Sequence, residues 1–364
     1  MRSSVVIFIL IGIVAMLADM VYEGGRSVLG PYMEFLEASM LVVGAVSIGD
    51  VIGYLFRGLS GALAYRLGDR AWVLLLAGYG LNVAVPLLAY LGDPMIALIL
   101  VVVERSGKGI RAPVKDALIA DLTEHTRIRG IAYGVHEVLD QTGAVLGPFI
   151  VAYRVSESYT SAYAILWIPY MASMVVLGVA LLLYRRISKT MYPRGDTIPW
   201  GYIISVSLPM AGFMHWALAG YVMGLEGVGP ATVAIAYTLA MLVDVVAAIP
   251  LSLLYRRVGD ASLLVAPLMS GLASIAVIKG GVLVAGAFWG LAMVVYETIV
   301  KAGLADRVPS GSRFYSFGML GLAQGLAWTI GNMVMSILSD NEPLLILYIL
   351  AVQLASVVVL YKSR

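Results

Sequence analysis

The chain contains 364 residues, of which 61% are apolar and only 13% are charged, and its formal net charge is +2. A soluble globular protein averages roughly 45–50% apolar and about 25% charged residues, so the composition excludes a soluble enzyme, a disordered chain and a nucleic-acid-binding protein. Because there is no cysteine, disulfides, thiolate metal sites and cysteine nucleophiles are excluded as well. The composition predicts an integral membrane protein.

Long apolar segments occupy most of the sequence. An apolar helix crosses the hydrocarbon core of a bilayer with about 20 residues. The hydropathy predicts an all-α membrane protein with twelve such helices. The expected spans are 4–28, 39–65, 71–92, 95–116, 129–153, 160–185, 200–223, 230–255, 261–279, 281–301, 313–338 and 343–361.

The basic residues between these spans are distributed unevenly. With the N-terminus inside, fifteen Lys and Arg residues lie in cytoplasmic segments, and only Arg154 and Lys279 lie in the opposite loops. Positively charged loops stay in the cytoplasm. We therefore predict a multi-pass protein of the cell (plasma) membrane with cytoplasmic N- and C-termini.

The two halves of the chain resemble each other. The polar stretch 188–199 separates residues 1–187 from residues 200–364. The segment Ala64–Asp69 recurs as Tyr255–Asp260, 191 residues later. In spans five and eleven a second set of positions repeats 184 residues on: Gly134, Asp140 and Gly147 against Gly318, Gln324 and Gly331. A parallel repeat of two six-helix bundles joined by a cytoplasmic linker suits alternating access.

Three short motifs resemble those of the major facilitator superfamily. Gly61 to Arg70 is similar to its G-x-L-a-D-R-x-G-R-[RK] loop, Arg105 to Gly109 to its R-x-x-x-G motif, and Gly143 to Pro148 to the G-x-x-x-G-P motif of drug:proton antiporters. The resemblance covers essentially the whole chain. The segments 19–26 and 107–121 are similar to a prokaryotic branch without an assigned substrate. The resemblance implies two pseudo-symmetric bundles of six transmembrane helices.

The resemblance also implies roles for the motif residues. Gly61, Arg66, Gly68, Asp69 and Arg70 would form the cytoplasmic gating motif, although Tyr65 stands where the family usually has Asp, and Asp69 where it has Arg.

On span five, Gly143, Gly147 and Pro148 would form a helix seam on which the halves rock. Small residues let helix backbones approach closely in membranes, and static close packing with a simple Pro148 bend is the alternative.

Sixteen ionisable residues lie within the predicted spans, thirteen of them in the first half. Such groups are costly in a bilayer and mark substrate or ion pathways when they are not permanent ion pairs. Permanent pairs of Glu104 with Lys108 and of Asp19 with Arg26 are the alternative. The proton-coupling candidates are Asp19, Glu23, Glu104, Arg105 and Asp140.

Other residues are candidates for the substrate cavity, which the family builds from spans one, four, seven and ten. These candidates are Arg26, His215 and Glu297. Five aromatic residues would add a cavity wall or belong to interfacial belts: Trp216, Tyr221, Trp289, Tyr296 and Trp328.

The repeat, the charged first half and the motif of span five favour a secondary active transporter that exports a small hydrophobic or amphipathic molecule in exchange for protons. Uptake by proton symport or facilitation is the alternative within this class. A receptor or scaffold on a transporter fold stays open because Tyr65 and Asp69 alter the gating motif. We predict no enzymatic activity, cofactor, metal or nucleic-acid partner, and a monomer in the lipid bilayer.

Overall fold

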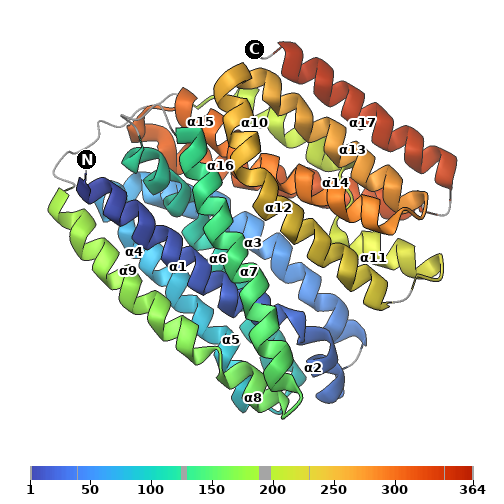
Figure 1. The fold of residues 1–364 in the computed structure, drawn as a ribbon, viewed down its shortest axis with the longest axis horizontal. Helices are drawn as coiled ribbons and strands as arrows, with labels where there is room; N and C mark the ends of the chain where they lie inside the picture. The colour runs from blue at the N-terminus through green and yellow to red at the C-terminus, as the bar shows by residue number, and fades with distance from the viewer. Residues whose placement is uncertain are drawn as a thin grey trace. The chain divides into compact units, whose positions relative to one another are not determined.

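The computed structural model describes residues 2–38, 40–123, 129–187, 198–228, 230–339 and 341–362, and all the regular structure in these ranges is helical (Figure 1). Residues 188–197 of the predicted linker lie outside the described residues.

The first half contains nine α-helices and three 3₁₀ segments among the described residues. They are α1 (Arg2–Ser27), α2 (Leu29–Phe35), α3 (Met40–Leu67), η1 (Gly68–Arg70), α4 (Trp72–Gly80), η2 (Leu81–Val83), α5 (Ala84–Leu87), η3 (Leu88–Tyr90), α6 (Pro94–Leu122), α7 (Arg129–Val155), α8 (Tyr159–Ala164) and α9 (Trp167–Ile187).

The second half follows the same plan, with a π-helical segment, η6, in place of one α-helical stretch. Its described elements are α10 (Trp200–Ser207), η4 (Leu208–Gly212), α11 (Trp216–Leu225), α12 (Pro230–Val258), η5 (Gly259–Leu264), α13 (Val265–Ile278), α14 (Val282–Val294), η6 (Val295–Val300), α15 (Lys301–Arg307), η7 (Ser310–Ser312), α16 (Arg313–Ile337) and α17 (Glu342–Lys362).

Each expected span coincides with one helix or with an interrupted helical stretch, so the all-helical fold class is confirmed. The span expected at 200–223 breaks into α10, η4 and α11, because Pro209 has no N–H to continue the helix. By length and composition, six helical stretches of the described chain can cross a membrane: Ser4–Ser27, Trp72–Tyr90, Tyr159–Tyr184, Ile235–Ile278, Val282–Arg307 and Glu342–Lys362. A total of twelve crossings stays a prediction.

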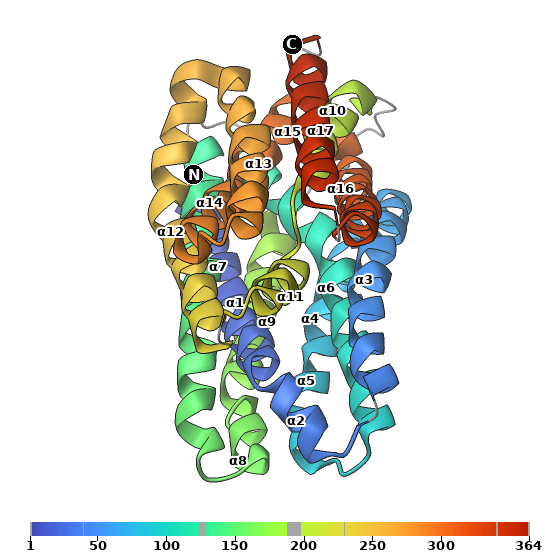
Figure 2. The same ribbon diagram turned by 90° about the vertical axis from the view of Figure 1, so that its right-hand side faces the viewer.

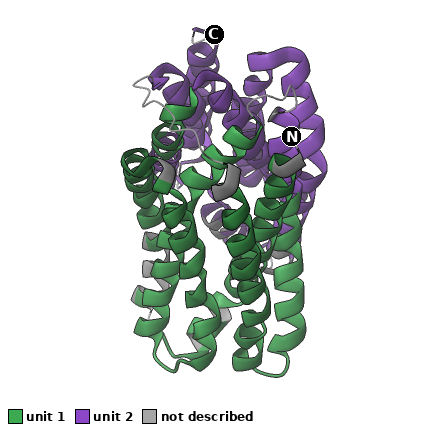
Figure 3. Ribbon diagram, turned by 90° about the vertical axis from the view of Figure 1, so that its left-hand side faces the viewer, with its two compact units in different colours: residues 1–125, 139–196, 309–319 green, residues 126–138, 197–308, 320–364 purple. Residues whose placement is uncertain are grey.

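The chain forms two compact units, coloured separately in Figure 3. Unit 1 comprises Met1–His125, Leu139–Asp196 and Pro309–Met319, and unit 2 comprises Thr126–Val138, Thr197–Val308 and Leu320–Arg364. In unit 1, α3 and α6 run side by side, as do α12 and α14 in unit 2 (Figure 2). Each unit thus includes the beginning of one long helix, α7 or α16, from the opposite half of the sequence.

The backbone supports the internal repeat. Gly68 and Gly259 occupy matching places in the repeated loop motif, with φ values of +53° and +56°. A side chain is strained in this left-handed region, so glycine is favoured at both turns. A 3₁₀ segment begins at each of them, η1 in one half and η5 in the other.

Helices α7 and α16 make matching close contacts. A Cβ on Gly318 of α16 would lie 2.7 Å from the Gly61 Cα of α3, inside unit 1. A Cβ on Gly134 of α7 would meet Ser252 of α12, inside unit 2. Since Ser252 lies 191 residues after Gly61, the two contacts occupy equivalent places in the repeat.

Gly143 is expected to be intolerant of any side chain. A Cβ there would overlap the carbonyl oxygen of Met16 on α1, whereas Gly178 on α9 has nothing within 4 Å of such an atom. Gly143→Ala should lower the free energy of unfolding by about 1–3 kcal/mol. Gly178→Ala should be neutral or stabilise by up to about 1 kcal/mol, because alanine favours helix. Thermal unfolding of both variants in detergent checks this, and equal melting temperatures would contradict a tight α1–α7 contact.

Candidate functional site

Helix α6 carries seven ionisable side chains of unit 1. Asp93 caps its first turn by accepting hydrogen bonds from the N–H groups of Met95 and Ile96 at 2.8 and 3.0 Å, and Pro94 suits the first helical position. The helix then continues for 29 residues. Glu104, Arg105, Lys108, Arg111, Lys115 and Asp116 therefore lie on one rigid element.

Arg105 lies at the centre of a buried ion-pair group. Its Nε atom is 3.3 Å from Asp50 Oδ1 of α3 and 3.8 Å from Glu104 Oε2. The helices approach closely because a Cβ on Gly49 would lie 3.1 Å from the Arg105 side chain, and one on Gly53 3.1 Å from its carbonyl oxygen. The structure thus brings the candidates Glu104 and Arg105 together and adds Asp50, which the sequence placed in a span without a partner.

Tyr22 of α1 is the main residue that sequence reasoning missed. Lys108 Nζ lies 4.0 Å from the centre of its ring, and the guanidinium carbons of Arg105 and Arg26 lie at 4.6 and 5.8 Å. Arg26 also donates a hydrogen bond to the Tyr22 hydroxyl at 3.2 Å. A cation over the negative face of an aromatic ring is stabilised electrostatically. The cationic groups of three side chains therefore lie near one aromatic ring.

Arg26 forms an ion pair with Glu23, at 3.9 Å and one turn away on α1. Asp19, the partner in the alternative considered above, lies within electrostatic range of Asp140, Lys108, Glu23 and Arg111, and among the described residues it forms no ion pair within 4.0 Å.

Asp140 of α7 forms an ion pair with Lys115, with 3.4 Å between Nζ and Oδ2. Nearby, Arg111 donates hydrogen bonds to Asn82 Oδ1 at 2.7 Å and to the Gly78 carbonyl at 3.3 Å, and it lies over the ring of Tyr79. Arg111 is therefore held by neutral groups.

A small cavity of about 20 Å³ lies beside this group, with Tyr22, Arg26, Glu104 and Arg105 among its lining residues. Glu104 is 3% exposed, and its Oε1 atom makes no hydrogen bond in the described structure. One water molecule needs roughly 10–15 Å³ and at least two polar partners. The cavity therefore has room for a single water beside this carboxylate.

Unit 2 contains an aromatic cluster. Phe213 stacks on Trp328, with 5.7 Å between ring centres and 3° between planes, and its ring lies 5.4 Å from that of Trp289 and 6.2 Å from that of Tyr296. The His215 ring lies 4.7 Å from that of Trp328. The predicted aromatic group thus assembles around Phe213, which sequence analysis did not single out, while the Tyr221 side chain lies outside the described residues.

Two further polar features accompany this cluster. The His215 backbone N–H donates to Asn332 Oδ1 at 2.7 Å. Glu297 lies within the π-helical segment η6 and pairs with Lys301. Single π-helical turns are frequent at functional sites.

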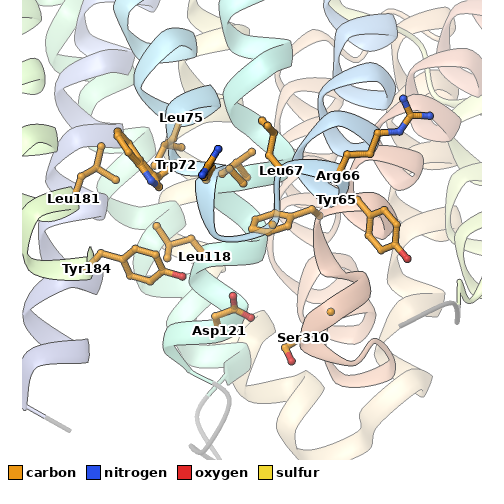
Figure 4. A pocket seen from close by; sticks show the side chains of 16 residues that line it. Tyr65, Arg66, Leu67, Trp72, Leu75, Leu118, Asp121, Leu181, Tyr184 and Ser310 are labelled. Atoms are coloured by element: carbon orange, nitrogen blue, oxygen red, sulfur yellow. The ribbon is translucent and has the colours of Figure 1, made fainter. Parts of the chain in front are cut away.

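The predicted gating motif lines a pocket of about 760 Å³ in unit 1 (Figure 4). Tyr65, Arg66, Gly68 and Arg70 contribute to its wall, and the Asp69 side chain lies outside the described part of the chain. Figure 4 shows Trp72, Tyr184 and the Asp121 carboxylate around the same space.

Two contacts join this region to the first turns of α16. The Tyr65 ring lies 6.0 Å from that of Tyr315, and Arg313 forms an almost completely buried ion pair with Asp121 of α6. Gly61 packs against Gly318 one turn further on. The unusual Tyr65 thus has an aromatic partner, and an ion pair outside the motif supplies the charge contact.

The remaining candidates on span five occupy the α1–α7 contact. A Cβ on Gly147 would overlap the Met20 carbonyl oxygen, and Pro148 follows inside α7.

In the described ranges, no group of three or more His, Asp or Glu residues could hold a metal ion.

Comparisons with known proteins place the chain among close relatives without a described activity. No protein-family profile matches it. It is 33% identical over 379 aligned positions to the uncharacterized protein Rv2265 of Mycobacterium tuberculosis, covering 97% of this chain and 91% of that one, and an uncharacterized protein of Mycobacterium bovis matches equally.

Solved structures give the fold. The transporter FucP in an outward conformation aligns over 100% of both chains, with a TM-score of 0.73 and 15% identity. A bacterial homologue of the iron transporter ferroportin aligns over 98% of both chains, with a TM-score of 0.72 and 14% identity. The proton:xylose symporter XylE aligns over 99% of this chain and 94% of its own, with a TM-score of 0.69 and 15% identity.

These neighbours are transporters. Their low sequence identity carries the likeness of fold alone. The chain belongs to the family of the mycobacterial protein Rv2265, and its fold is that of the major facilitator superfamily transporters.

Proposed function

We propose that the chain is a secondary active transporter that works by alternating access and exports a small hydrophobic or amphipathic molecule in exchange for protons. The observation that carries this proposal is the group of charged side chains that α1, α3, α6 and α7 bury in unit 1. A static membrane protein has no need of so many charges in a costly environment, whereas a proton-coupled transporter uses them.

Proton coupling requires a carboxylate whose surroundings change during the cycle. Asp19 is the preferred proton site, because it lacks a close ion pair but lies within range of acids and bases. Glu104 and Glu23, beside Arg105 and Arg26, and the Asp140–Lys115 pair complete the coupling group. Loading and release of a proton would follow when the neighbouring cations move, because nearby charges and desolvation set which form of a carboxyl is favoured.

In unit 1 the substrate-cavity candidate is Arg26, and in unit 2 the candidates are His215, whose ring lies beside that of Trp328, and Glu297. In this proposal the domains are two six-helix bundles, 1–187 and 200–364, in a monomer of the plasma membrane with both termini in the cytoplasm.

Two helix contacts would hold the cytoplasmic side closed. One joins α3 and α6 to the first turns of α16, through Gly61 with Gly318 and through the Asp121–Arg313 pair. The other joins α7 to α12 through Gly134 and Ser252. Glycine-lined contacts have little side-chain interlock, so they can separate and reform during a cycle.

Proton symport is the second candidate function. It is favoured by two fold neighbours, the fucose:proton symporter of Escherichia coli and the proton:xylose symporter. A receptor on a transporter fold would need only one conformation, and the first experiment below separates it from either transporter.

Breaking the Asp121–Arg313 pair should open the cytoplasmic side. Ser316 is fully buried one turn beyond Arg313, and the chain has no cysteine of its own. A Ser316→Cys variant should therefore react slowly with a maleimide in lipid nanodiscs. Adding Arg313→Gln should speed the reaction several-fold.

The double change Asp121→Asn with Arg313→Gln is the matched control, because a single change leaves a buried charge unpaired and destabilises the fold. Faster labelling of Ser316→Cys in both backgrounds, with unchanged thermal stability in the double variant, supports the proposal that the Asp121–Arg313 pair holds the cytoplasmic side closed. Labelling as slow in both as in Ser316→Cys alone would contradict it and favour a static receptor.

Asp19→Asn and Arg105→Gln should abolish proton-driven transport. In proteoliposomes screened with amphipathic compounds, an imposed pH gradient should drive accumulation of a transported compound by the unmodified chain. Glu157→Gln is the control, since this exposed acid pairs only with Arg154 and Ser161 at a loop. Gradient-driven transport with an intact pH dependence in Asp19→Asn and Arg105→Gln would exclude both residues from coupling.

A further inference from the structure

We propose that the transported molecule carries a negative charge and that the ammonium group of Lys108 binds it. This inference rests on the proposed transport function and names the substrate class. It comes from the partners of the six basic side chains that lie within the predicted spans of the first half, because in the described chain these partners leave Lys108 with an aromatic ring and no carboxylate within 4.0 Å.

Three of the six basic residues are compensated by acids at close range. Arg26 pairs with Glu23, Arg105 with Asp50 and Glu104, and Lys115 with Asp140.

Two others contact uncharged groups. Arg111 is buried and satisfied by Asn82 and the Gly78 carbonyl, and Arg57 lies over the ring of Tyr54 on its own helix, 5.3 Å away.

Lys108, like Arg57, lies over an aromatic ring and forms no ion pair with a carboxylate in the described chain, but its ring belongs to another helix and also contacts Arg105 and Arg26. Within the described chain no carboxylate oxygen lies within 4.0 Å of its ammonium, its contact is the Tyr22 ring at 4.0 Å, and the side chain is partly exposed. An ammonium has three N–H donors, and a ring face satisfies its charge only in part. The remaining donors are available to a ligand.

Tyr22 acts as a positioning residue in this arrangement. Its hydroxyl is fixed by Arg26 and its other contacts are with Arg105 and Lys108. The ring holds Lys108 in place without neutralising it, whereas a carboxylate in the same position would close the site with a permanent ion pair. An aromatic support next to a cation suits an anion that also has an apolar body.

The competing explanation is that Lys108 balances several carboxylates at longer range. Asp19, Asp50 and Glu104 all lie within its electrostatic range. Asp50 and Glu104 already share Arg105, however.

The test measures the thermal stability of the purified full-length protein against three probes of similar size: benzoate, its neutral amide benzamide, and the cation trimethylanilinium. A bound ligand raises the melting temperature of the state that it binds. We expect benzoate at millimolar concentration to stabilise the protein and the other two probes to have no effect. Inorganic phosphate is a second anion arm that distinguishes a phosphate head group from a carboxylate.

Lys108→Gln should weaken benzoate binding by about tenfold or more, the usual value of one charge-assisted hydrogen bond. Lys108→Arg should retain part of the affinity. Tyr22→Phe should bind like the unmodified chain because it keeps the ring, and Tyr22→Leu should not. Lys279→Gln, which changes an exposed loop lysine paired with Glu342, should bind normally.

Absence of stabilisation by either anion, or equal stabilisation of the Lys108→Gln variant, would overturn the inference. So would a stronger effect of benzamide or trimethylanilinium than of benzoate. The labelling of Ser316→Cys does not depend on charge recognition, so opening of the Arg313→Gln variant without anion binding would reject the anionic substrate and leave alternating access standing.

Discussion

The cost of placing charge in a bilayer governs the arrangement of unit 1. Helix α6 carries seven ionisable side chains between Glu104 and Asp121, and each needs a partner because an isolated charge at this depth costs several kcal/mol. The partners come from α1, α3, α4, η2, α7 and the first turns of α16, so the position of α6 fixes the rotation of its neighbours. A helix without these charges would be free to turn about its axis at little cost.

Glycine makes these partnerships possible by removing side chains from the helix contacts. On one side of α6, a Cβ on Gly109 would overlap the Gly53 carbonyl of α3; on another, a Cβ on Gly107 would lie 2.8 Å from the Gly78 carbonyl of α4. Backbones this close bring Asp50 within reach of Arg105 and Asn82 within reach of Arg111. A wider helix spacing would leave both arginines without these partners. In unit 1, the pairing of the charged side chains therefore depends on the close helix packing that glycine allows.

The sequence predicted the helices, the repeat and most of the charged residues, because hydropathy and glycine spacing are local patterns. It did not predict the pairing. The i, i+4 spacing suggested Glu104 with Lys108, yet Glu104 lies against Arg105 and Lys108 against Tyr22. Which faces of two helices meet depends on contacts between distant segments. In addition, the sequence does not show whether an aromatic residue in an apolar helix, such as Tyr22, forms a cation–π contact or only packs in the core.

The segment that resembles a gating motif carries Tyr65 beside the contact between α6 and the first turns of α16. Tyr65 replaces an acid and contacts Tyr315 through its ring, while the nearby Asp121–Arg313 pair supplies a charge contact between α6 and α16. An aromatic contact depends little on protonation, whereas a buried ion pair weakens sharply once water reaches it. A small separation of α6 from α16 would therefore remove most of the ion-pair attraction at once, so that this contact would be either closed or open.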